Sequence, residues 1–462
     1  MREVNDGIFR RYDIRGRAAE DLTEEVVTHL GRAYGTVIRR SGGARVALGR
    51  DCRTSGARIM QNFEAGVRAA GVDVVRLGVV PTPVVYFSLH HYSVDGGVVI
   101  TGSHNPPAWN GFKLCNGKNS MHGEQITGLC SLMKSEDYTS GDGAAEDLDP
   151  RQDYIDWIAQ NVKPAEGHFS VVIDAGNGTG GIVAGELYRA LGASVTELYC
   201  EPDGAFPNHH PDPTVEENLV ELKAKVMELG ADLGIAFDGD ADRIGAIDPK
   251  GRVVWGDQLM TFFGKAVLEV EPGARIVGEV KCSKVMYDEL RAAGAQIEMW
   301  KVGHSLIKAR MKEIDASLAG EMSGHLFFAD RYFGFDDAVY AGARLIELLS
   351  RSSRSLDQMV DALPIMFATP ELRVACSDST KFMVTERVAA YFRSQYPVID
   401  VDGVRIEFDH GWGLVRASNT QPVLVMRFEA ASPEARDAYR AEVEAWLRAN
   451  EPEVDFDADT HH

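Results

Sequence analysis

The chain has 462 residues, a length that corresponds to about three domains of ordinary size. Hydrophobic residues make up 45% and charged residues 25%, as in globular proteins that bury several cores without disulfide or metal crosslinks. The 48 Lys and Arg residues against 69 Asp and Glu residues give a net charge of −21, which argues against a nucleic-acid partner. Small anionic substrates are not excluded, because they require only a locally positive cleft.

The cysteines and the apolar segments bear on the compartment in which the protein resides. The six cysteines are scattered without a CxxC pair, which fits neither a zinc site nor a disulfide framework and favours a reducing compartment. The N-terminus has no apolar segment of the kind found in signal peptides. The most apolar stretch, Leu77–Phe87, contains two prolines and is too short to span a bilayer. We therefore expect a cytoplasmic protein with no membrane partner.

One pattern occurs three times along the chain. A Gly that ends a helix-like segment precedes a β-rich run at Ala69–Val75, Ala190–Val195 and Ala292–Ile297. Further along each repeat, a short apolar strand leads into a polar loop, and we expect these strands at Gly97–Thr101, Leu233–Phe237 and Ser317–Gly320. The recurrence predicts three duplicated mixed α/β domains with largely parallel sheets. In such sheets function gathers at the carboxyl ends of strands, where the three polar loops lie.

The first polar loop, Thr101–Pro107, reads TGSHNPP and places Ser103 beside His104 at a strand end. An acyl-transfer couple is one interpretation, but adjacent residues rarely adopt that geometry and the chain has no Gly-x-Ser-x-Gly elbow here. Ser103 carrying a phosphate, with a metal ion balancing its charge, is a second interpretation. A plain structural turn explains this segment equally well when it is taken alone.

A glycine run at Gly176–Gly181 follows an expected strand at Ser170–Asp174. It matches the dinucleotide-binding pattern G-x-G-x-x-G, with Glu197 or Glu201 about twenty residues further on. The six-stranded unit that normally surrounds this pattern is missing from the expected elements. We therefore favour a glycine-rich turn between a strand and a helix.

The second polar loop, DGDADR, alternates three carboxylates at Asp238, Asp240 and Asp242. Carboxylates this close repel one another unless a cation lies between them, and hard oxygen ligands suit Mg²⁺ or Ca²⁺. An EF-hand is excluded, because its glycine and glutamate positions hold Arg243 and Pro249. Mg²⁺ usually combines a few carboxylates with phosphate oxygens, and Arg243 is suited to holding such a phosphate. The alternative is a solvated acidic turn.

Two further loops have polar compositions that suit a sugar phosphate. The third loop, GEMSGH, presents Glu321, Ser323 and His325, which together offer donors and acceptors for sugar hydroxyls. A fourth segment, Arg416–Pro422, reads RASNTQP and suits phosphate binding through its guanidinium, hydroxyl and backbone N–H groups, with Arg427 as a second positive charge. Each segment taken alone is as typical of an ordinary polar loop or β-turn.

The C-terminal part of the chain has a different pattern. A helix expected near Lys381–Arg393 precedes three strand candidates at Val404–Phe408, Gly413–Ala417 and Val423–Glu429, and Ser432 begins a last amphipathic helix. This order predicts a small α+β domain with an antiparallel sheet. Breaks in the pattern divide the chain into four domains, which we expect at residues 1–150, 151–250, 251–368 and 369–462.

Taken together, the four loops resemble those of the α-D-phosphohexomutases, most closely the bacterial phosphomannomutase/phosphoglucomutase group. TGSHNPP is similar to the family's phosphoserine loop, DGDADR to its Mg²⁺ loop, GEMSGH to its sugar-binding loop and RASNTQP to its phosphate-binding loop. Further matches are FRRYDIRG, NGFK, FPNHHPDP and KVGHSLIK, so the resemblance covers nearly the whole chain in order. One departure is Gln421, where related sequences often carry Thr or Glu.

The resemblance implies a four-domain, heart-shaped molecule in which each domain contributes one loop to a central cleft. Ser103 would be phosphorylated, and Asp238, Asp240 and Asp242 would hold Mg²⁺ together with a phosphoserine oxygen. The phosphate of the substrate would lie on Arg416, Ser418, Asn419, Thr420 and Arg427, and the sugar on Glu321, Ser323, His325, Tyr12 and Lys281. The residues that would stabilise charge or move protons are Arg243, Lys113, Arg15, His104 and His304.

The implied reaction is a reversible conversion of hexose 1-phosphate and hexose 6-phosphate, with mannose or glucose as the sugar. It passes through a 1,6-bisphosphate that reorients in the cleft and also serves as activator. The alternatives are a phosphoglucosamine mutase, a metal-dependent sugar phosphatase in which water accepts the phosphoryl group, and a sugar-phosphate sensor without activity. The sequence leaves open whether the protein is a monomer or a dimer.

Overall fold

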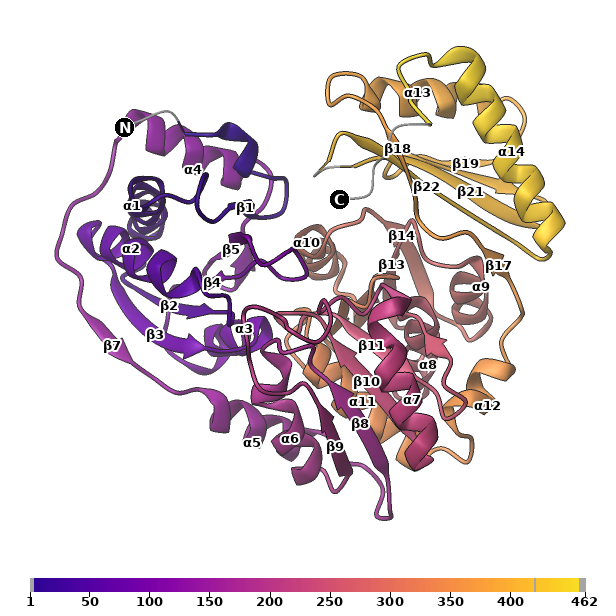
Figure 1. The fold of residues 1–462 in the computed structure, drawn as a ribbon, viewed down its shortest axis with the longest axis horizontal. Helices are drawn as coiled ribbons and strands as arrows, with labels where there is room; N and C mark the ends of the chain where they lie inside the picture. Colours follow the sequence, from indigo (N-terminus) through magenta and orange to yellow (C-terminus); the bar gives the residue numbers. More distant parts are fainter. Residues whose placement is uncertain (1–3, 419–420, 457–462) are drawn as a thin grey trace.

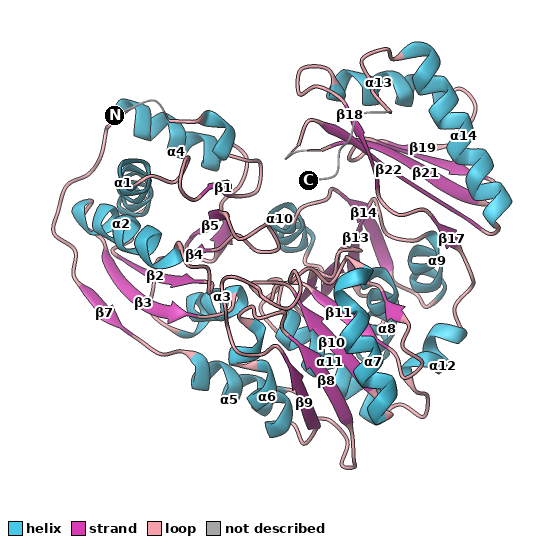
Figure 2. Cartoon of the chain, viewed as in Figure 1, coloured by secondary structure: helices cyan, strands magenta, loops and turns pink. Residues whose placement is uncertain are grey.

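The computed structural model describes residues 4–418 and 421–456, which form four units, each built on one β-sheet. The units follow one another round an arc, so that the first and the fourth lie at its two ends (Figure 1). Helices and strands are interspersed in the first three units, whereas the fourth packs two helices against its sheet (Figure 2). No helix among the described residues combines the length and apolar character that crossing a membrane requires.

The first unit carries a seven-stranded sheet. Its elements are β1 Ile14–Arg17, α1 Glu24–Arg40, β2 Arg45–Arg50, α2 Gly56–Ala69, β3 Asp73–Val79, α3 Thr82–His91, β4 Gly96–Ile100, β5 Trp109–Asn116, β6 Asn119–Ser120, α4 Glu124–Ser135 and β7 Ala145–Asp147. The second unit has a five-stranded sheet. Its elements are α5 Arg151–Asn161, β8 Ser170–Asp174, α6 Ala184–Ala190, β9 Ser194–Leu198, α7 Val220–Leu229, β10 Leu233–Phe237, β11 Ile244–Ile247 and β12 Val253–Val254.

The third unit has a four-stranded sheet and the fourth a six-stranded one. The third comprises α8 Gly256–Val270, β13 Arg275–Glu279, α9 Lys284–Ala292, β14 Gln296–Trp300, α10 His304–Ile314, β15 Leu318–Gly320, β16 Leu326–Phe328, α11 Ala338–Arg351 and α12 Leu356–Asp361. The fourth comprises β17 Phe367–Ala368, β18 Leu372–Ala375, α13 Lys381–Phe392, β19 Val398–Ile399, β20 Val404–Phe408, β21 Gly411–Ala417, β22 Val423–Ala430 and α14 Pro433–Asn450.

The first three sheets repeat one arrangement, in β2–β5, β8–β11 and β13–β16. In each set the first strand lies between the second and the third and runs parallel to both, and the fourth pairs antiparallel with the third. This confirms the predicted duplication of mixed α/β domains. Every polar loop singled out in these units connects the third strand to the fourth, so one position in the topology supplies all three.

The fourth unit confirms the predicted antiparallel sheet. All of its strand pairs are antiparallel, and β20, β21 and β22 lie side by side in that order. The Ser432 hydroxyl accepts a hydrogen bond from the Ala435 N–H and so caps α14. The predicted bounds of β8, β10 and β20 match the structure, and the other predicted strands end within two residues of their expected positions. The predicted domain boundaries stay a prediction.

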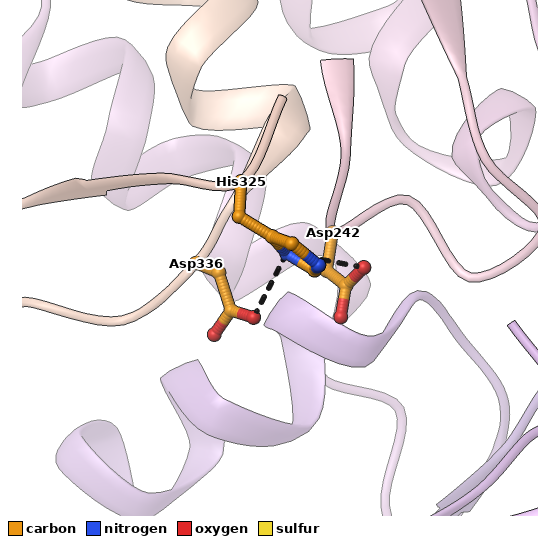
Figure 3. A group of neighbouring side chains, drawn as sticks. All are labelled: Asp242, His325 and Asp336. Atoms are coloured by element: carbon orange, nitrogen blue, oxygen red, sulfur yellow. Dashed lines mark ion pairs between the residues drawn. The ribbon is translucent and has the colours of Figure 1, made fainter. Parts of the chain in front are cut away.

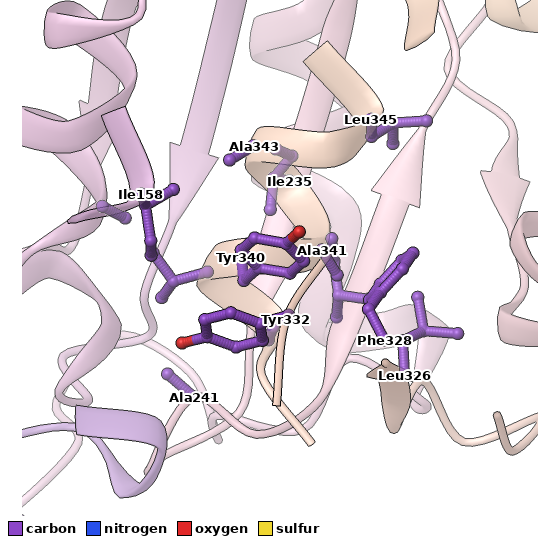
Figure 4. Packing of buried hydrophobic residues seen from close by; sticks show 14 of the residues in the cluster. Ile158, Ile235, Ala241, Leu326, Phe328, Tyr332, Tyr340, Ala341, Ala343 and Leu345 are labelled. Carbon is purple, nitrogen blue, oxygen red and sulfur yellow. The ribbon is translucent and has the colours of Figure 1, made fainter. Parts of the chain in front are cut away.

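One hydrophobic core runs through the first three units, and the fourth has its own. In the shared core the Tyr332 and Tyr340 rings stack with centroids 4.0 Å apart (Figure 4). Ala241, from the middle of the DGDADR loop, belongs to the same cluster. The acidic loop is therefore anchored in the hydrophobic core. The glycine run packs beneath that loop, because a Cβ on Gly178 would lie 2.7 Å from the Gly239 carbonyl oxygen.

Candidate active site

Ser103 lies at the carboxyl end of β4, and its side chain reaches the acidic loop of the second unit. Its hydroxyl donates a hydrogen bond of 2.8 Å to Asp238 Oδ2, across a sequence separation of 135 residues. The His104 Nδ1 lies 3.2 Å from the same hydroxyl oxygen. Ser103 is 1% exposed and adopts a φ of 48°, a left-handed conformation that is uncommon for a residue with a side chain. The serine and the aspartate trio therefore form one buried site.

The three aspartates share their site with a lysine of the first unit. Lys113, on β5, donates to Asp240 Oδ2 at 2.7 Å and to Asp242. Burial by itself disfavours the carboxylate form, but Lys113 outweighs it and holds the pKa of Asp240 below its usual value. Burial and the neighbouring carboxylates raise the pKa of Asp238 and of Asp242. One lysine thus leaves the trio with excess negative charge.

The aspartate trio fits a divalent cation. One ligand oxygen from each of Asp238, Asp240 and Asp242 lies within 4.8 Å of the others, and all three residues are fully buried. Asp240 Oδ1 and Asp242 Oδ1 have no hydrogen-bond partner among the described residues. Buried carboxylate oxygens without partners are costly unless a cation binds them, and hard oxygen donors suit Mg²⁺.

A second group, Asp242, His325 and Asp336, lies beside the trio (Figure 3). The His325 Nδ1 is 3.6 Å from Asp242 Oδ1 and 3.2 Å from Asp336 Oδ2. Arg243 Nε donates to His325 Nε2 at 2.9 Å, which places the proton of the neutral imidazole on Nδ1. Although these three residues have the spacing of a cation site, a protonated Nδ1 has no lone pair to offer a cation. The contacts of His325 orient Arg243.

The other candidates for charge stabilisation lie around this centre. Arg15 donates to Asp13 Oδ2 at 2.6 Å and to Asn105 Oδ1 at 3.1 Å, within the Ser103 loop. His304 begins α10 and its Nδ1 lies 3.4 Å from Asp336 Oδ2. Burial and nearby cations lower the pKa of both His104 and His304, so both imidazoles are neutral.

Of the predicted sugar-binding residues, Glu321, Ser323 and Tyr12 lie where the first and third units meet, whereas Lys281 contacts the fourth unit. Glu321 accepts a hydrogen bond of 2.6 Å from the Gly303 N–H and one of 3.4 Å from the Ser323 hydroxyl. The Tyr12 ring packs against Gly303, where a Cβ would lie 2.6 Å from the ring. Burial, with Asp402 and Glu321 nearby, raises the pKa of Tyr12 to about 12. Tyr12 thus joins the first unit to the GEMSGH loop.

The predicted phosphate-binding residues belong to the fourth unit. Arg416 is 6% exposed and donates to Asp402 Oδ2 at 3.0 Å. Arg427 instead faces the third unit, where its Nη1 donates to the Lys281 carbonyl at 2.8 Å. The Lys281 ammonium lies 3.3 Å from a Glu371 carboxylate oxygen. Ser418 is buried at the end of the strand, whereas Asn419 and Thr420 lie outside the described residues.

Several residues of the site escaped the sequence analysis. Thr82 donates a hydrogen bond of 2.6 Å to Asp240 Oδ2, and Lys308 lies 2.8 Å from Asp336 Oδ1. Arg53 donates to the Ser103 carbonyl at 2.7 Å. The position of Arg53 directly after β2, at the carboxyl edge of the first sheet, is a signal that could have found it. Lys308 ends the KVGHSLIK match but was given no role there, and no comparable pattern marks Asp336.

Known protein families match this chain along most of its length. The matching families are described as phosphoglucomutase/phosphomannomutase, alpha/beta/alpha domains I, II and III, and the C-terminal domain of the same enzymes. They match residues 6–140, 152–251, 255–367 and 371–445, in that order. The chain belongs to the phosphoglucomutase/phosphomannomutase family, a family of isomerases, as the resemblance of its four loops predicted.

Individual relatives agree with this assignment. A Pseudomonas aeruginosa protein named phosphomannomutase/phosphoglucomutase is 43% identical over 443 residues, which cover 96% of each chain. A Neisseria gonorrhoeae protein named phosphoglucomutase is 42% identical, over 97% of this chain and 98% of its own. The crystal structure of a phosphoglucomutase/phosphomannomutase family protein from Burkholderia thailandensis superposes with a TM-score of 0.91 at 39% identity, covering 98% of this chain and 99% of that one.

Proposed function

We propose that this protein interconverts hexose 1-phosphates and hexose 6-phosphates of mannose, glucose or both, using a phosphoryl group carried on Ser103. The contact that carries this proposal is the 2.8 Å hydrogen bond between the Ser103 hydroxyl and Asp238. It brings a buried nucleophile to a carboxylate trio with the chemistry of a Mg²⁺ site. The names of the relatives, which combine phosphomannomutase and phosphoglucomutase, support the sugar class.

The proposed reaction consists of two phosphoryl transfers, each of which moves a different phosphoryl group. First, the bond between phosphorus and Ser103 Oγ breaks while a bond to the free sugar hydroxyl forms, and the hydroxyl proton leaves to a nearby base. The product is a hexose 1,6-bisphosphate and a serine alkoxide that takes up a proton. His104, with Nδ1 3.2 Å from Oγ, is placed to exchange a proton with that oxygen. After the sugar turns over, Ser103 accepts the other phosphoryl group by the reverse sequence.

Asp238, Asp240 and Asp242 are the residues that would hold Mg²⁺. Bound there, Mg²⁺ would offset the negative charge on the phosphoryl oxygens during transfer. Arg243 contributes a fixed positive charge beside the trio, and its orientation is set by the hydrogen bond to His325 Nε2. Lys113 supplies a second cation at the same place, held by two of the aspartates.

The substrate would bind between the third and fourth units. Glu321 and Ser323 offer an acceptor and a donor that tolerate either orientation of a hexose, because paired ring hydroxyls present both functions. Arg416 and Ser418, together with the predicted contributions of Asn419 and Thr420, would hold the phosphate that is not being transferred. Hexose phosphates are thus the proposed partners, and the cytoplasm is the proposed location.

The decisive experiment supplies mannose 1-phosphate and glucose 1-phosphate with Mg²⁺ and a trace of the bisphosphate, and identifies the products. We expect the 6-phosphates from the wild type. Ser103→Ala should reduce kcat by about 10,000-fold or more, because the nucleophile is lost. Ser88→Ala, a buried serine on α3, is the matched control.

Other outcomes of the same experiment separate the alternatives. Free phosphate as the product would identify a phosphatase. When glucosamine 1-phosphate is added as a third substrate, its faster turnover would identify a phosphoglucosamine mutase. Activity of Ser103→Ala close to that of the wild type would refute the proposal. The mass of the intact wild type provides an independent measurement, because a sensor without activity should carry no phosphate on Ser103.

A further inference from the structure

Arg53 lies beneath the Ser103 loop and holds four of its backbone carbonyl groups. Its Nη1 donates to the carbonyls of Pro106 at 2.7 Å and Trp109 at 3.1 Å. Its Nη2 donates to the carbonyls of Ser103 at 2.7 Å and Asn105 at 2.6 Å. The two terminal nitrogens of one planar guanidinium therefore bind the loop at four points, a pattern that a lysine ammonium cannot reproduce.

The remaining side of the guanidinium is held by Asp51. Arg53 Nε donates to Asp51 Oδ2 at 3.0 Å, and the two side chains are 0% and 2% exposed. Asp51 Oδ2 also accepts hydrogen bonds from the Thr101 hydroxyl at 2.8 Å and from the Gly102 N–H at 3.0 Å. The pair therefore binds the N-terminal part of the loop through Asp51 and the rest of it through Arg53.

The loop needs such support because of its conformation. Ser103 has a φ of 48°, which costs free energy unless the surroundings enforce it. The loop backbone lies close to the Arg53 guanidinium, since a Cβ on Gly102 would lie 2.5 Å from the guanidinium carbon. The second unit covers the same guanidinium with the Phe206 ring, at 5.3 Å from its centroid. Without Arg53, four carbonyl groups in a dry environment would lose a donor.

We propose that Arg53 is the positioning residue that fixes Ser103 for phosphoryl transfer, acting through the backbone of residues 103–109. The inference rests on the proposed function of Ser103 and extends it to a residue that touches neither the acidic trio nor the predicted sugar-binding residues through any described hydrogen bond. Arg53 belongs to a buried support whose geometry decides how well the nucleophile is aimed.

The first test compares Arg53→Ala with Arg58→Ala. Arg58 is the matched control, because its guanidinium also donates to two backbone carbonyls, those of Ala18 and Leu22, outside the Ser103 loop. We expect Arg53→Ala to lower kcat by about 100-fold with little change in KM, as expected when a reacting group is misplaced. Millimolar guanidinium chloride, far below denaturing concentrations, should restore much of this loss in Arg53→Ala and leave the wild type and Arg58→Ala unchanged.

The second test uses amide hydrogen exchange and does not depend on activity. Arg53→Lys retains the positive charge but lacks the two terminal nitrogens of the guanidinium. In this variant, amide hydrogen exchange should become faster at residues 101–109 and stay unchanged in the fourth unit. Wild-type exchange in this loop, a kcat within twofold of wild type, or a loss of activity that guanidinium does not restore in a folded variant would overturn the inference. If the wild type converts no hexose phosphate, the proposed function fails, whereas the exchange result still decides whether Arg53 holds the loop.

Discussion

The surroundings of Ser103 and the fourth unit are built in contrasting ways. Ser103 and the aspartate trio rest on the hydrophobic core that the first three units share. The fourth unit has a separate core, and it meets the third through a small apolar cluster, formed by Val280, Trp412 and Leu414, together with buried polar groups. Arg405 donates to the carbonyls of Val280 at 2.8 Å and Cys282 at 2.7 Å, and its guanidinium lies 3.9 Å from the Trp412 ring centroid.

A buried carboxylate completes this polar contact between the third and fourth units. Glu429 accepts hydrogen bonds from the Ser283 hydroxyl, the Lys284 N–H and the Trp412 indole N–H, at 2.8 to 3.0 Å. Such bonds are directional and specific, yet each contributes little net free energy compared with an extensive apolar core. The difference teaches that the reacting serine has both an extensive apolar core and a buried hydrogen-bonded support, whereas the proposed phosphate-binding end is attached by a small apolar cluster and a limited set of hydrogen bonds.

The largest effect should come from the packed region. Asp238→Asn removes a carboxylate that accepts the Ser103 hydroxyl and would bind Mg²⁺, so we expect kcat to fall about 1,000-fold. Asp147→Asn, at an exposed carboxylate, is the control. Metal affinity measured by titration calorimetry should fall in the first variant alone. EDTA should abolish wild-type activity and added Mg²⁺ should restore it; activity that survives EDTA would contradict a metal site.

A charge on the fourth unit should affect binding more than chemistry. Arg416→Ala removes a buried guanidinium that we assign to the distant phosphate, so KM should rise about 10- to 100-fold while kcat changes less. Arg436→Ala on α14 should leave both constants unchanged. Steady-state kinetics with glucose 1-phosphate measures the split. A fall in kcat without a rise in KM would indicate that Arg416 acts on the transferred phosphoryl group. It would contradict the contrast between the two regions.

The attachment of the fourth unit offers a third test. Arg405→Leu leaves the Val280 and Cys282 carbonyls without their donor, at a cost of about 2–3 kcal/mol in the free energy that holds the unit in place. Hydrogen exchange should accelerate across β19–β22, and KM should rise. Arg393→Leu, at an exposed guanidinium paired with Asp400, is the control. Unchanged exchange in β19–β22 would show that apolar contacts alone hold the unit.

The last effect concerns stability and not activity, and it is a pH dependence of the shared core. Burial raises the pKa of Asp337 to about 7, although the Tyr340 N–H and the hydroxyls of Tyr332 and Tyr154 donate to it. Because an unfolded aspartate loses its proton near pH 4, raising the pH from about 4 to 7 costs the folded state stability relative to an uncharged side chain. The thermal midpoint of Asp337→Asn should therefore fall less over this range than that of the wild type. Parallel curves would contradict a dry core around Asp337.

Local patterns determined a large part of the architecture. Short-range sequence patterns indicate glycines after helices, short apolar strands and polar loops. For this reason the three repeats, the antiparallel C-terminal sheet and all four loops could be predicted. Ser103 and the aspartate trio became candidates through the resemblance of these loops to those of the family, because the Ser103 loop taken alone fits a plain turn equally well.

Only the tertiary structure decided which partners those residues have. Lys113, Thr82 and Arg53 reach the site from other elements. No local sequence pattern shows how close these side chains lie to Ser103 and the aspartates. The predicted roles of His325 and Arg427 at the substrate stay predictions, and the structure adds the contacts that no loop pattern shows: His325 accepts from Arg243, and Arg427 donates to the Lys281 carbonyl. Sequence fixes what chemistry a side chain offers; burial and packing among distant segments select the group that uses it, because a buried polar atom must bond whatever the fold brings within reach.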